Sequence, residues 1–386
     1  MFDLKKAVRP NILKLKPYRC ARDDYSAGIL LDANENTHGP ALDDVSKYTQ
    51  LGSDLERYPD PYQVEVKELL CKFRNIPSTN YFYLGVGSDE VIDMAIRVFV
   101  TPGKEKILIT PPTYGMYSVC AQINDVETVK IPLIVDDGAF QLNVIKILDA
   151  IKSDPLIKIV FLCSPGNPTG TLLQENDIKQ ILECSDFNGV VLVDEAYIDF
   201  CETSEKRSSV CTWVTKYPNL IVTQTLSKAF GLAGIRLGLS IANPEITQIF
   251  NNTKAPYNIS TPTSMLGRDA LSAAGLKVMR AHIESIQKQR VYLIDQLSKL
   301  PFVSRFLGAH DANFILVQFA NSNGEADNNV AMSIYKQLAE IDGVVVRFRG
   351  MELGCEGCLR ITVGTEEENK ILMAKLSSEI MSNFAK

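Results

Sequence analysis

The chain has 386 residues, of which 46% are hydrophobic and 22% charged, and its formal net charge is -6 at pH 7. This composition is typical of a globular protein with roughly two to three domains, and the negative charge argues against a nucleic acid or an anionic membrane as partner. Nine scattered cysteines fit no disulfide framework and favour a reducing compartment. Since the sequence has neither a run of 18 apolar residues nor a signal-peptide core, we expect a cytoplasmic protein.

The first segment with a clear pattern is "YFYLGVGSDEVIDMAIRVF", residues 81–99, which predicts a strand, a turn with glycine and a helix. The amides around Gly87, Ser88 and Asp89 would lie at the helix N-terminus, where a phosphate binds well. The dinucleotide-binding pattern G-x-G-x-x-G is incomplete here, because Glu90 stands where the third glycine is required. The chain also has no GK[ST] signature of a P-loop. The segment therefore predicts a site for the phosphate of a smaller cofactor.

Four short apolar, β-rich segments follow in the middle of the chain, with polar and helical stretches between them. Runs of this kind are typical of a sheet covered on both faces, as in α/β domains. One of the stretches between them, residues 174–185, has its apolar residues on one helix face. The predicted strands are residues 105–110, 157–163, 189–195 and 219–226.

Polar or aromatic side chains follow each of these strands. They are Tyr114, then Asn167, then Asp194 with Tyr197, and finally Ser227 with Lys228. Ligands of open α/β sheets bind beyond the carboxyl ends of the strands, so one pocket would collect all of these side chains. Each has a plainer explanation by itself: turn chemistry, a helix cap, a core tyrosine, or a surface lysine. Four coincidences at one sheet edge favour a shared site.

Lys228 lies in "NLIVTQTLSKAFGLAGIRLG", where no acidic residue is available to pair with its amine. A lysine, an aspartate, an asparagine and two tyrosines, with Ser227 and Arg236 for a phosphate, meet the requirements of pyridoxal phosphate. Lys228 would form the Schiff base, and Asp194 would pair with the ring nitrogen. A base role needs a pKa below the usual value of about 10.4, which burial beside Arg236 would give.

The last part of the chain, from about residue 261, predicts a long helix followed by a smaller α+β domain. Apolar residues such as Ile286, Leu293, Leu297 and Leu300 recur at three-to-four spacing and its multiples, so this helix would bridge the domains. Further strands are predicted at residues 313–319, 343–348 and 358–364, before a last helix. We place the large domain at residues 50–265, and the small domain with an N-terminal arm at residues 1–49 and 266–386.

Three motifs, "SPGNPTG", "VDEAY" and "TLSKAFGLAGIRLG", resemble those of fold-type-I, pyridoxal-phosphate-dependent aminotransferases, and the resemblance covers nearly the whole chain. Motifs such as "LDANENTHGP", "RYPDPY", "PPTYGMYSV" and "CLRITVGT" are similar to those of fungal histidinol-phosphate aminotransferases. The resemblance implies a mostly parallel sheet sandwiched by helices, a smaller α+β domain, and a homodimer with shared active sites. It implies that L-histidinol phosphate and 2-oxoglutarate give 3-(imidazol-4-yl)-2-oxopropyl phosphate and L-glutamate in a ping-pong reaction of histidine biosynthesis.

The resemblance also implies roles for individual residues. Lys228, Asp194 and Tyr197 would be catalytic. The cofactor would be bound by Gly87, Ser88, Asp89, Tyr114, Asn167, Asp194, Tyr197, Ser227, Lys228, Arg236 and, reaching from the other subunit, Tyr58. The substrates would be bound by Tyr18, Asn34, Arg347 and Arg360. Arginine suits a site that must accept carboxylate and phosphate in turn, whereas the plainer interpretation of Arg347 and Arg360 is a pair of surface charges.

Several alternatives stay open. An aromatic-amino-acid aminotransferase or a threonine-phosphate decarboxylase would use the same scaffold. A regulator that binds pyridoxal phosphate would carry an added DNA-binding module, but here the resemblance begins almost at residue 1. His38, His282 and His310 form no paired motif for a serine hydrolase or a zinc site. Cys355 and Cys358 in "CEGC" have no second pair, so we expect no metal, and "GMELGCEG" departs from bacterial members and leaves its loop shape open.

Overall fold

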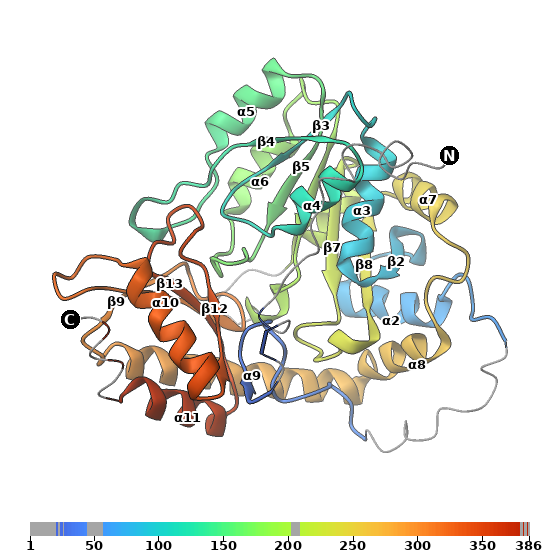
Figure 1. Ribbon diagram of the computed structural model, residues 1–386. Coiled ribbons are helices and arrows are strands. Elements are labelled where there is room, and N and C mark those ends of the chain that lie inside the picture. The colour runs from blue at the N-terminus through green and yellow to red at the C-terminus, as the bar shows by residue number, and fades with distance from the viewer. Residues whose placement is uncertain are drawn as a thin grey trace, which may run out of the picture.

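The computed structural model describes residues 21, 24, 25, 27–44, 57–201, 209–378, 381 and 384. Its largest element is a seven-stranded sheet (Figure 1). In spatial order the strands are β2 (Phe82–Val86), β8 (Leu237–Ala242), β7 (Leu220–Thr225), β6 (Val190–Asp194), β5 (Ile157–Cys163), β3 (Lys106–Ile109) and β4 (Glu127–Lys130). β8 is antiparallel to β2 and β7, and the other neighbouring pairs are parallel. The predicted α/β class with a mostly parallel sheet is confirmed.

Helices cover both faces of this sheet (Figure 1). Successive residues of a strand point to opposite faces, so Ile159 and Phe161 of β5 join one apolar core, and Val160 and Leu162 join the other. The first core is completed by α3 (Gly87–Phe99), α4 (Met116–Ile123) and α7 (Pro244–Thr253). The second is completed by α2 (Val64–Arg74), α5 (Val144–Ser153) and α6 (Glu175–Leu182). Burial on both faces explains why the sequence of β5 is apolar without alternation.

The strand β8 was not predicted, although it fixes the geometry of the candidate site. Its Gly238 lies against the start of α3: a Cβ atom there would be 2.2 Å from the carbonyl carbon of Gly87 and 2.3 Å from the amide nitrogen of Ser88. Only glycine allows this approach. The connection from β7 to β8, which contains Lys228, is thereby held next to the N-terminus of α3.

A second, antiparallel sheet contains β12 (Arg347–Phe348), β13 (Cys358–Thr362), β10 (Phe314–Phe319) and β9 (Val303–Leu307), in this spatial order. The prediction of a single strand at residues 343–348 is wrong. Residues Val344–Val345 form β11, which pairs in parallel with β1 (Ile29–Leu30), whereas β12 pairs with β13. The apolar run "VVV" gives no sign of the change of partner, which occurs at the fully buried Val346.

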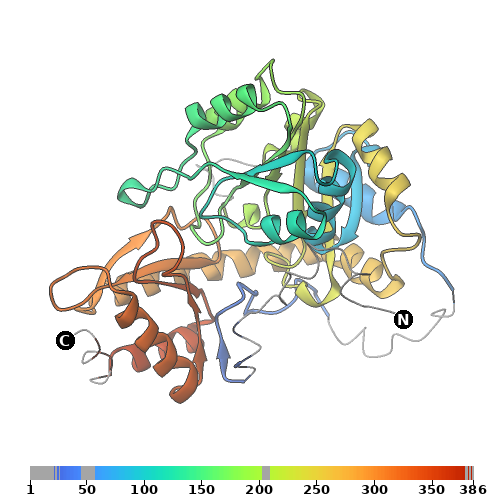
Figure 2. The ribbon, with the colours of Figure 1, turned by 45° about the horizontal axis from the view of Figure 1, so that its top comes forward.

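The helical pattern predicted from residue 261 is divided between two helices. α8 (Thr261–Ala270) ends before Ser272, whose side chain accepts a hydrogen bond from the amide of Gly275 and so caps α9 (Ala273–Leu297). Leu300 lies beyond the end of α9. Figures 1 and 2 show α9 running from beside α11 (Glu366–Leu376) to α8, past both sheets. The remaining α-helix among the described residues is α10 (Asn328–Lys336).

The N-terminal segment, by which we mean residues 27–44, lies against the C-terminal part of the chain. Besides the pairing of β1 with β11, the amide of Thr362 donates a hydrogen bond to the carbonyl of Leu31 at 3.0 Å. This arrangement is consistent with one domain made of both ends of the chain, but the boundaries at residues 49, 50, 265 and 266 stay a prediction. Among the described helices, none combines the length and apolar character that crossing a membrane requires.

Candidate active site

The polar residues predicted at the strand ends line one cavity of about 260 Å³. The cavity lies beyond the carboxyl ends of β5, β6 and β7 and also receives side chains from β12 and β13. The predicted site residues that line it are Asn34, Ser88, Asp89, Tyr114, Asn167, Asp194, Tyr197, Ser227, Lys228, Arg236, Arg347 and Arg360. Gly87 and Tyr58 are not among its lining residues, and Tyr18 lies outside the described residues.

The amine of Lys228 is held in place by the N-terminal segment. Its Nζ donates a hydrogen bond to the carbonyl of Ala33 at 3.0 Å. Burial lowers the pKa of Lys228 to about 8, and the charge of Arg360 acts in the same direction. Glu35 and Asp89 oppose this shift of the pKa of Lys228, so carboxylates distant in the sequence do lie near the amine. The balance gives an amine that loses its proton far more readily than a free lysine.

Asp194 is a buried carboxylate at the end of β6. Its Oδ2 accepts a hydrogen bond from the hydroxyl of Tyr117 at 2.7 Å, and its Oδ1 accepts one from the amide of Ala196 at 3.2 Å. Burial raises the pKa of Asp194 to about 6, although both hydrogen bonds lower it. Tyr117 was not among the predicted site residues. It belongs to "PPTYGMY" and lies in α4, whereas Tyr114 lies just before the helix, and the two rings meet edge to face with their centroids 5.6 Å apart.

A positively polarised helix end and an arginine meet at one side of the cavity. α3 begins at Gly87, which has a φ of +74°. A Cβ atom on Gly87 would lie 2.6 Å from Nη2 of Arg236, so glycine is needed for the arginine to lie there. Arg236 also approaches the carboxylate of Asp89 to 3.3 Å, and the same carboxylate accepts a hydrogen bond from the hydroxyl of Tyr114 at 3.0 Å. Amides, guanidinium and Ser227 together suit a phosphate group.

Tyr197 is held by Asn34 of the N-terminal segment. Nδ2 of Asn34 donates a hydrogen bond to the hydroxyl of Tyr197 at 3.0 Å, and Oδ1 of Asn34 accepts one from the hydroxyl of Thr362 at 3.2 Å. Asn34 has a φ of 53°, a left-handed conformation that asparagine tolerates better than most residues. Asn34 therefore lines the cavity and also orients a tyrosine, which the sequence analysis had not foreseen.

Arg360 lies buried at the cavity wall, and its hydrogen-bond partners among the described residues are neutral oxygens. Its Nη1 donates to Oδ1 of Asn167 at 2.6 Å, and its Nη2 donates to the carbonyl of Asp32 at 2.5 Å. Burial and the nearby charge of Arg349 lower the pKa of Arg360 to about 9. A buried guanidinium beside a second one is unfavourable unless an anion binds there. This end of the cavity is therefore suited to an anionic ligand.

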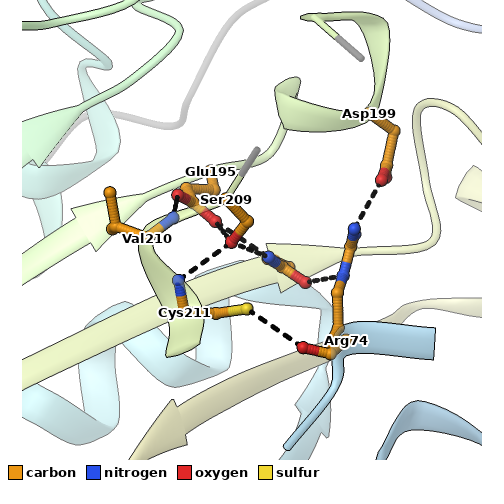
Figure 3. A network of polar contacts seen from close by, with 7 residues as sticks. Arg74, Glu195, Asp199, Ser209, Val210 and Cys211 are labelled. Atoms are coloured by element: carbon orange, nitrogen blue, oxygen red, sulfur yellow. Dashed lines mark hydrogen bonds and ion pairs between the residues drawn. The ribbon is translucent and has the colours of Figure 1, made fainter. Parts of the chain in front are cut away.

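A buried polar network lies behind the site, and Figure 3 shows most of its members. Arg74, at the end of α2, forms an ion pair with Asp199 at 2.8 Å and donates a hydrogen bond to Gln224 at 2.7 Å. Gln224 donates in turn to Glu195 at 2.8 Å and to Ser209 at 3.1 Å. Glu195 directly follows Asp194, and Gln224 lies in β7 shortly before Lys228. The network therefore fixes the two strand ends that carry the aspartate and the lysine.

The predicted partner-subunit residue Tyr58 lies on the surface. Its side chain is 81% exposed, and its ring stacks on that of Tyr257 at 4.5 Å between centroids. Tyr62 nearby in the sequence is also exposed.

The rings of His38 and His282 stack on each other with their centroids 5.3 Å apart. Within the described ranges, no group of three or more His, Cys, Asp or Glu side chains is placed to hold a metal.

The chain is similar to known aminotransferases over nearly its whole length. A model of the aminotransferase class I and II family matches residues 26–376. The chain is 51% identical over 386 residues to a histidinol-phosphate aminotransferase of Saccharomyces cerevisiae, with 97% of this chain and 96% of that protein covered. It is 49% identical to one of Schizosaccharomyces pombe, with 100% of both chains covered. The crystal structure of histidinol-phosphate aminotransferase from Sinorhizobium meliloti in complex with pyridoxal-5'-phosphate has the same fold, with a TM-score of 0.84, 21% identity and 98% of each chain covered. The chain therefore belongs to the class I and II aminotransferases.

Proposed function

We propose that this protein transfers the amino group of L-histidinol phosphate to 2-oxoglutarate. The products are 3-(imidazol-4-yl)-2-oxopropyl phosphate and L-glutamate, in a step of histidine biosynthesis. The observation that carries the proposal is a single cavity in which the amine of Lys228 and the carboxylate of Asp194 face a group of arginines. The name shared by relatives at 49% to 51% identity favours this activity over an aromatic-amino-acid aminotransferase or a threonine-phosphate decarboxylase. It also favours an enzyme over a regulatory domain.

The chemistry of the donor set fits pyridoxal phosphate as cofactor. In the part of the chain that the structure describes, the buried carboxylate of Asp194 contacts a hydroxyl and an amide rather than a cation, and burial raises its pKa to about 6. A protonated pyridine nitrogen would supply the missing positive charge. Pyridoxal phosphate supplies an aldehyde that takes up an amino group and a ring that draws electrons from the substrate carbon. The family to which the chain belongs supports this assignment.

The chain offers separate groups for the parts of this cofactor. The hydroxyl of Tyr197 accepts its hydrogen bond from Asn34, so its own hydrogen is available for the ring oxygen. The oxygen of Asn167 is used by Arg360, which leaves the amide hydrogens of Asn167 for the same atom. The phosphate would be bound by Arg236, Ser227 and the amides of Ser88 and Asp89. The amide of Gly87, which was predicted to bind it too, already donates to the carbonyl of Arg236 at 2.9 Å. Tyr114 would lie against the ring face.

Lys228 would act as the base. Its amine has a lowered pKa of about 8, so a substantial fraction is unprotonated in mildly alkaline solution. The amine takes a proton from the substrate carbon and returns it to a neighbouring carbon, which requires a pKa near the working pH. Arg360 and Arg347 would bind the anionic end of each substrate, because a guanidinium binds a carboxylate or a phosphate through two hydrogen bonds. One site then serves both halves of a ping-pong reaction.

The proposal includes a homodimer whose active sites are shared between the two subunits, and a cytoplasmic location. Exposed apolar and aromatic patches mark interfaces, and the rings of Tyr58 and Tyr257, which are 81% and 41% exposed, stack on each other. Tyr62, four residues after Tyr58, is 71% exposed. Tyr58 would reach the cofactor phosphate in the other subunit. Each cysteine that the structure describes is free, which agrees with a reducing compartment.

A donor panel tests the function. Wild-type protein supplied with pyridoxal phosphate and 2-oxoglutarate is offered L-histidinol phosphate, L-histidinol, phenylalanine, aspartate and threonine phosphate, and glutamate formation is measured. We expect the highest kcat/KM with L-histidinol phosphate. A preference for phenylalanine or aspartate would leave only the aminotransferase assignment standing. Borohydride reduction followed by peptide mapping tests the cofactor site, with the label expected on Lys228 and absent from a Lys228→Ala variant.

A further inference from the structure

Three arginines lie on one face of the smaller sheet, at the cavity. Arg347 in β12 is directly opposite Arg360 in β13. Arg349 is two residues beyond Arg347, and its amide donates to the carbonyl of Cys358 at 2.9 Å, so the strand pairing continues to this residue. Residues two apart on a strand share a face, and all three arginines line the cavity. Like charges directly opposite each other weaken a sheet, so this arrangement indicates that the face binds anions.

Arg349 differs from Arg360 because it has a carboxylate partner. Its Nη1 lies 2.7 Å from Oε1 of Glu352, and the two side chains are 21% and 28% exposed. Its Nε is buried and has no hydrogen-bond partner among the described residues, and the same holds for the Nε of Arg360. One guanidinium therefore has both a replaceable carboxylate and an unused donor. An ion pair at this partly exposed position is weak enough to be exchanged for a ligand.

The segment "GMELGCEG" produces this pairing. The amide of Glu352 donates to the carbonyl of Arg349 at 3.0 Å, that of Cys355 to the carbonyl of Glu352 at 3.0 Å, and that of Cys358 to the carbonyl of Cys355 at 3.0 Å. These successive turns bring Glu352 back to Arg349. Cys355 and Cys358 are fully buried, so they serve as small apolar core residues of the loop. The loop whose shape the sequence left open is thus the element that supplies the carboxylate.

The two substrates of the proposed reaction make different demands on this face. A phosphate monoester has three terminal oxygens and close to two negative charges, whereas the side-chain carboxylate of glutamate has two oxygens and one charge. Arg360 already commits one hydrogen of Nη1 to Asn167 and one of Nη2 to the carbonyl of Asp32. A phosphate therefore has acceptors left over for a further guanidinium. A carboxylate does not need one.

We propose that Arg349 is a phosphate-selective residue that exchanges Glu352 for the phosphate of the substrate. When a carboxylate substrate occupies the cavity, Arg349 stays paired with Glu352, and Arg347 and Arg360 bind the ligand. The inference rests on the proposed function and extends it, because it assigns the discrimination between the two substrates to one residue pair.

The two half-reactions of the holoenzyme, followed separately by the change in cofactor absorbance, test this inference. Arg349→Gln removes a charge-assisted hydrogen bond, so we expect its kcat/KM for L-histidinol phosphate to fall about ten- to hundred-fold. The loss in the glutamate half-reaction should be at least about fivefold smaller. Glu352→Gln frees Arg349 and should tighten competitive inhibition by inorganic phosphate several-fold. Arg349→Lys keeps the charge and should recover part of the loss. Arg305→Gln removes an arginine of β9 that bonds Gln318 instead of lining the cavity, and is the matched control.

If Arg349→Gln lowers kcat/KM equally in both half-reactions, or leaves kcat/KM for L-histidinol phosphate unchanged, the role of Arg349 is overturned while the proposed function stays intact. If wild-type protein fails to use L-histidinol phosphate at all, the proposed function is wrong, and inhibition by inorganic phosphate still tests the anion site. An Arg349→Gln variant that does not fold is replaced by Glu352→Gln, whose phosphate inhibition must tighten for the inference to stand.

Discussion

Replacing Arg74 by methionine should destabilise the fold about as much as a large core truncation does. The guanidinium pairs with Asp199 at 2.8 Å, with side chains only 5% and 7% exposed, and also donates to Gln224. Methionine keeps much of the length but removes the charge, so the carboxylates of Asp199 and Glu195 stay buried without their cation. Breaking a buried ion pair from one side costs about 3–5 kcal/mol. Since folded proteins are stable by only about 5–15 kcal/mol, the loss is easily measured.

Equilibrium unfolding in urea, followed by the fluorescence of Trp213, gives this free energy. Trp213 is the single tryptophan of the chain, and it lies in the short helix Val210–Thr215 that starts next to Ser209 of the network. The double variant Arg74→Met with Asp199→Asn is the control: it removes one of the two stranded charges, so it should be more stable than Arg74→Met alone. A single-variant loss below about 1 kcal/mol, or no recovery in the double variant, would refute the reasoning.

The pH dependence of Arg74→Met checks the same reasoning. Burial raises the pKa of Glu195, and Arg74 is one of the groups that lower it. Without Arg74 the pKa of Glu195 in the folded protein rises further above its unfolded value of about 4.3. A raised carboxyl pKa costs stability above that pKa, and the cost disappears as the pH falls toward the unfolded value. The difference between Arg74→Met and wild type should therefore shrink as the pH is lowered toward about 4.

The remaining predictions concern the site. Lys228→Met should raise the free energy of unfolding of the protein without cofactor by about 2–3 kcal/mol at pH 7, because burial lowers the pKa of the amine to about 8 in the fold. This gain in stability should vanish as the pH rises from 8 toward the unfolded pKa of about 10.4. Urea unfolding that shows no gain at pH 7 would contradict the prediction. Asp194→Ala should lower kcat by about a hundredfold or more, measured with saturating cofactor, and near-wild-type turnover would exclude a role for this carboxylate. Arg360→Ala should lower kcat/KM for L-histidinol phosphate by about ten- to hundred-fold, and much less for unphosphorylated histidinol; equal losses for both donors would place the phosphate elsewhere. Mixing inactive Lys228→Ala chains with inactive Tyr58→Ala chains should restore activity in heterodimers, and its absence would argue against shared sites.

Much of the site could be predicted because most of its residues directly follow short apolar strands that the sequence shows clearly. The apolar runs of β5, β6 and β7 are buried on both faces, so each is visible in the sequence, and each ends at the residues that line the cavity. The start of α3 at Gly87 was predictable for the same reason, since the change from strand to helix period occurs at a glycine. The lowered pKa of Lys228 was expected from burial, and burial is its largest cause.

The other features depend on contacts between residues far apart in the chain. Arg360, the second cause of the lowered pKa of Lys228, belongs to the smaller sheet, and Ala33, which accepts the hydrogen bond of Lys228, comes from the N-terminal segment. The sequence contains several tyrosines and arginines near the right motifs, and nothing local distinguishes Tyr117 or Arg349 from the ones that were selected.

The sequence by itself therefore determined the α/β class, the large sheet's central strands and the position of Lys228 just after one of them, because periodicity and turn chemistry are properties of short segments. Only the tertiary structure decided that β8 runs antiparallel, that one valine-rich run serves two sheets, and that Glu352 folds back onto Arg349. Partner choice in a sheet or an ion pair is settled by which surfaces pack together, and packing brings together residues whose separation along the chain carries no local signal.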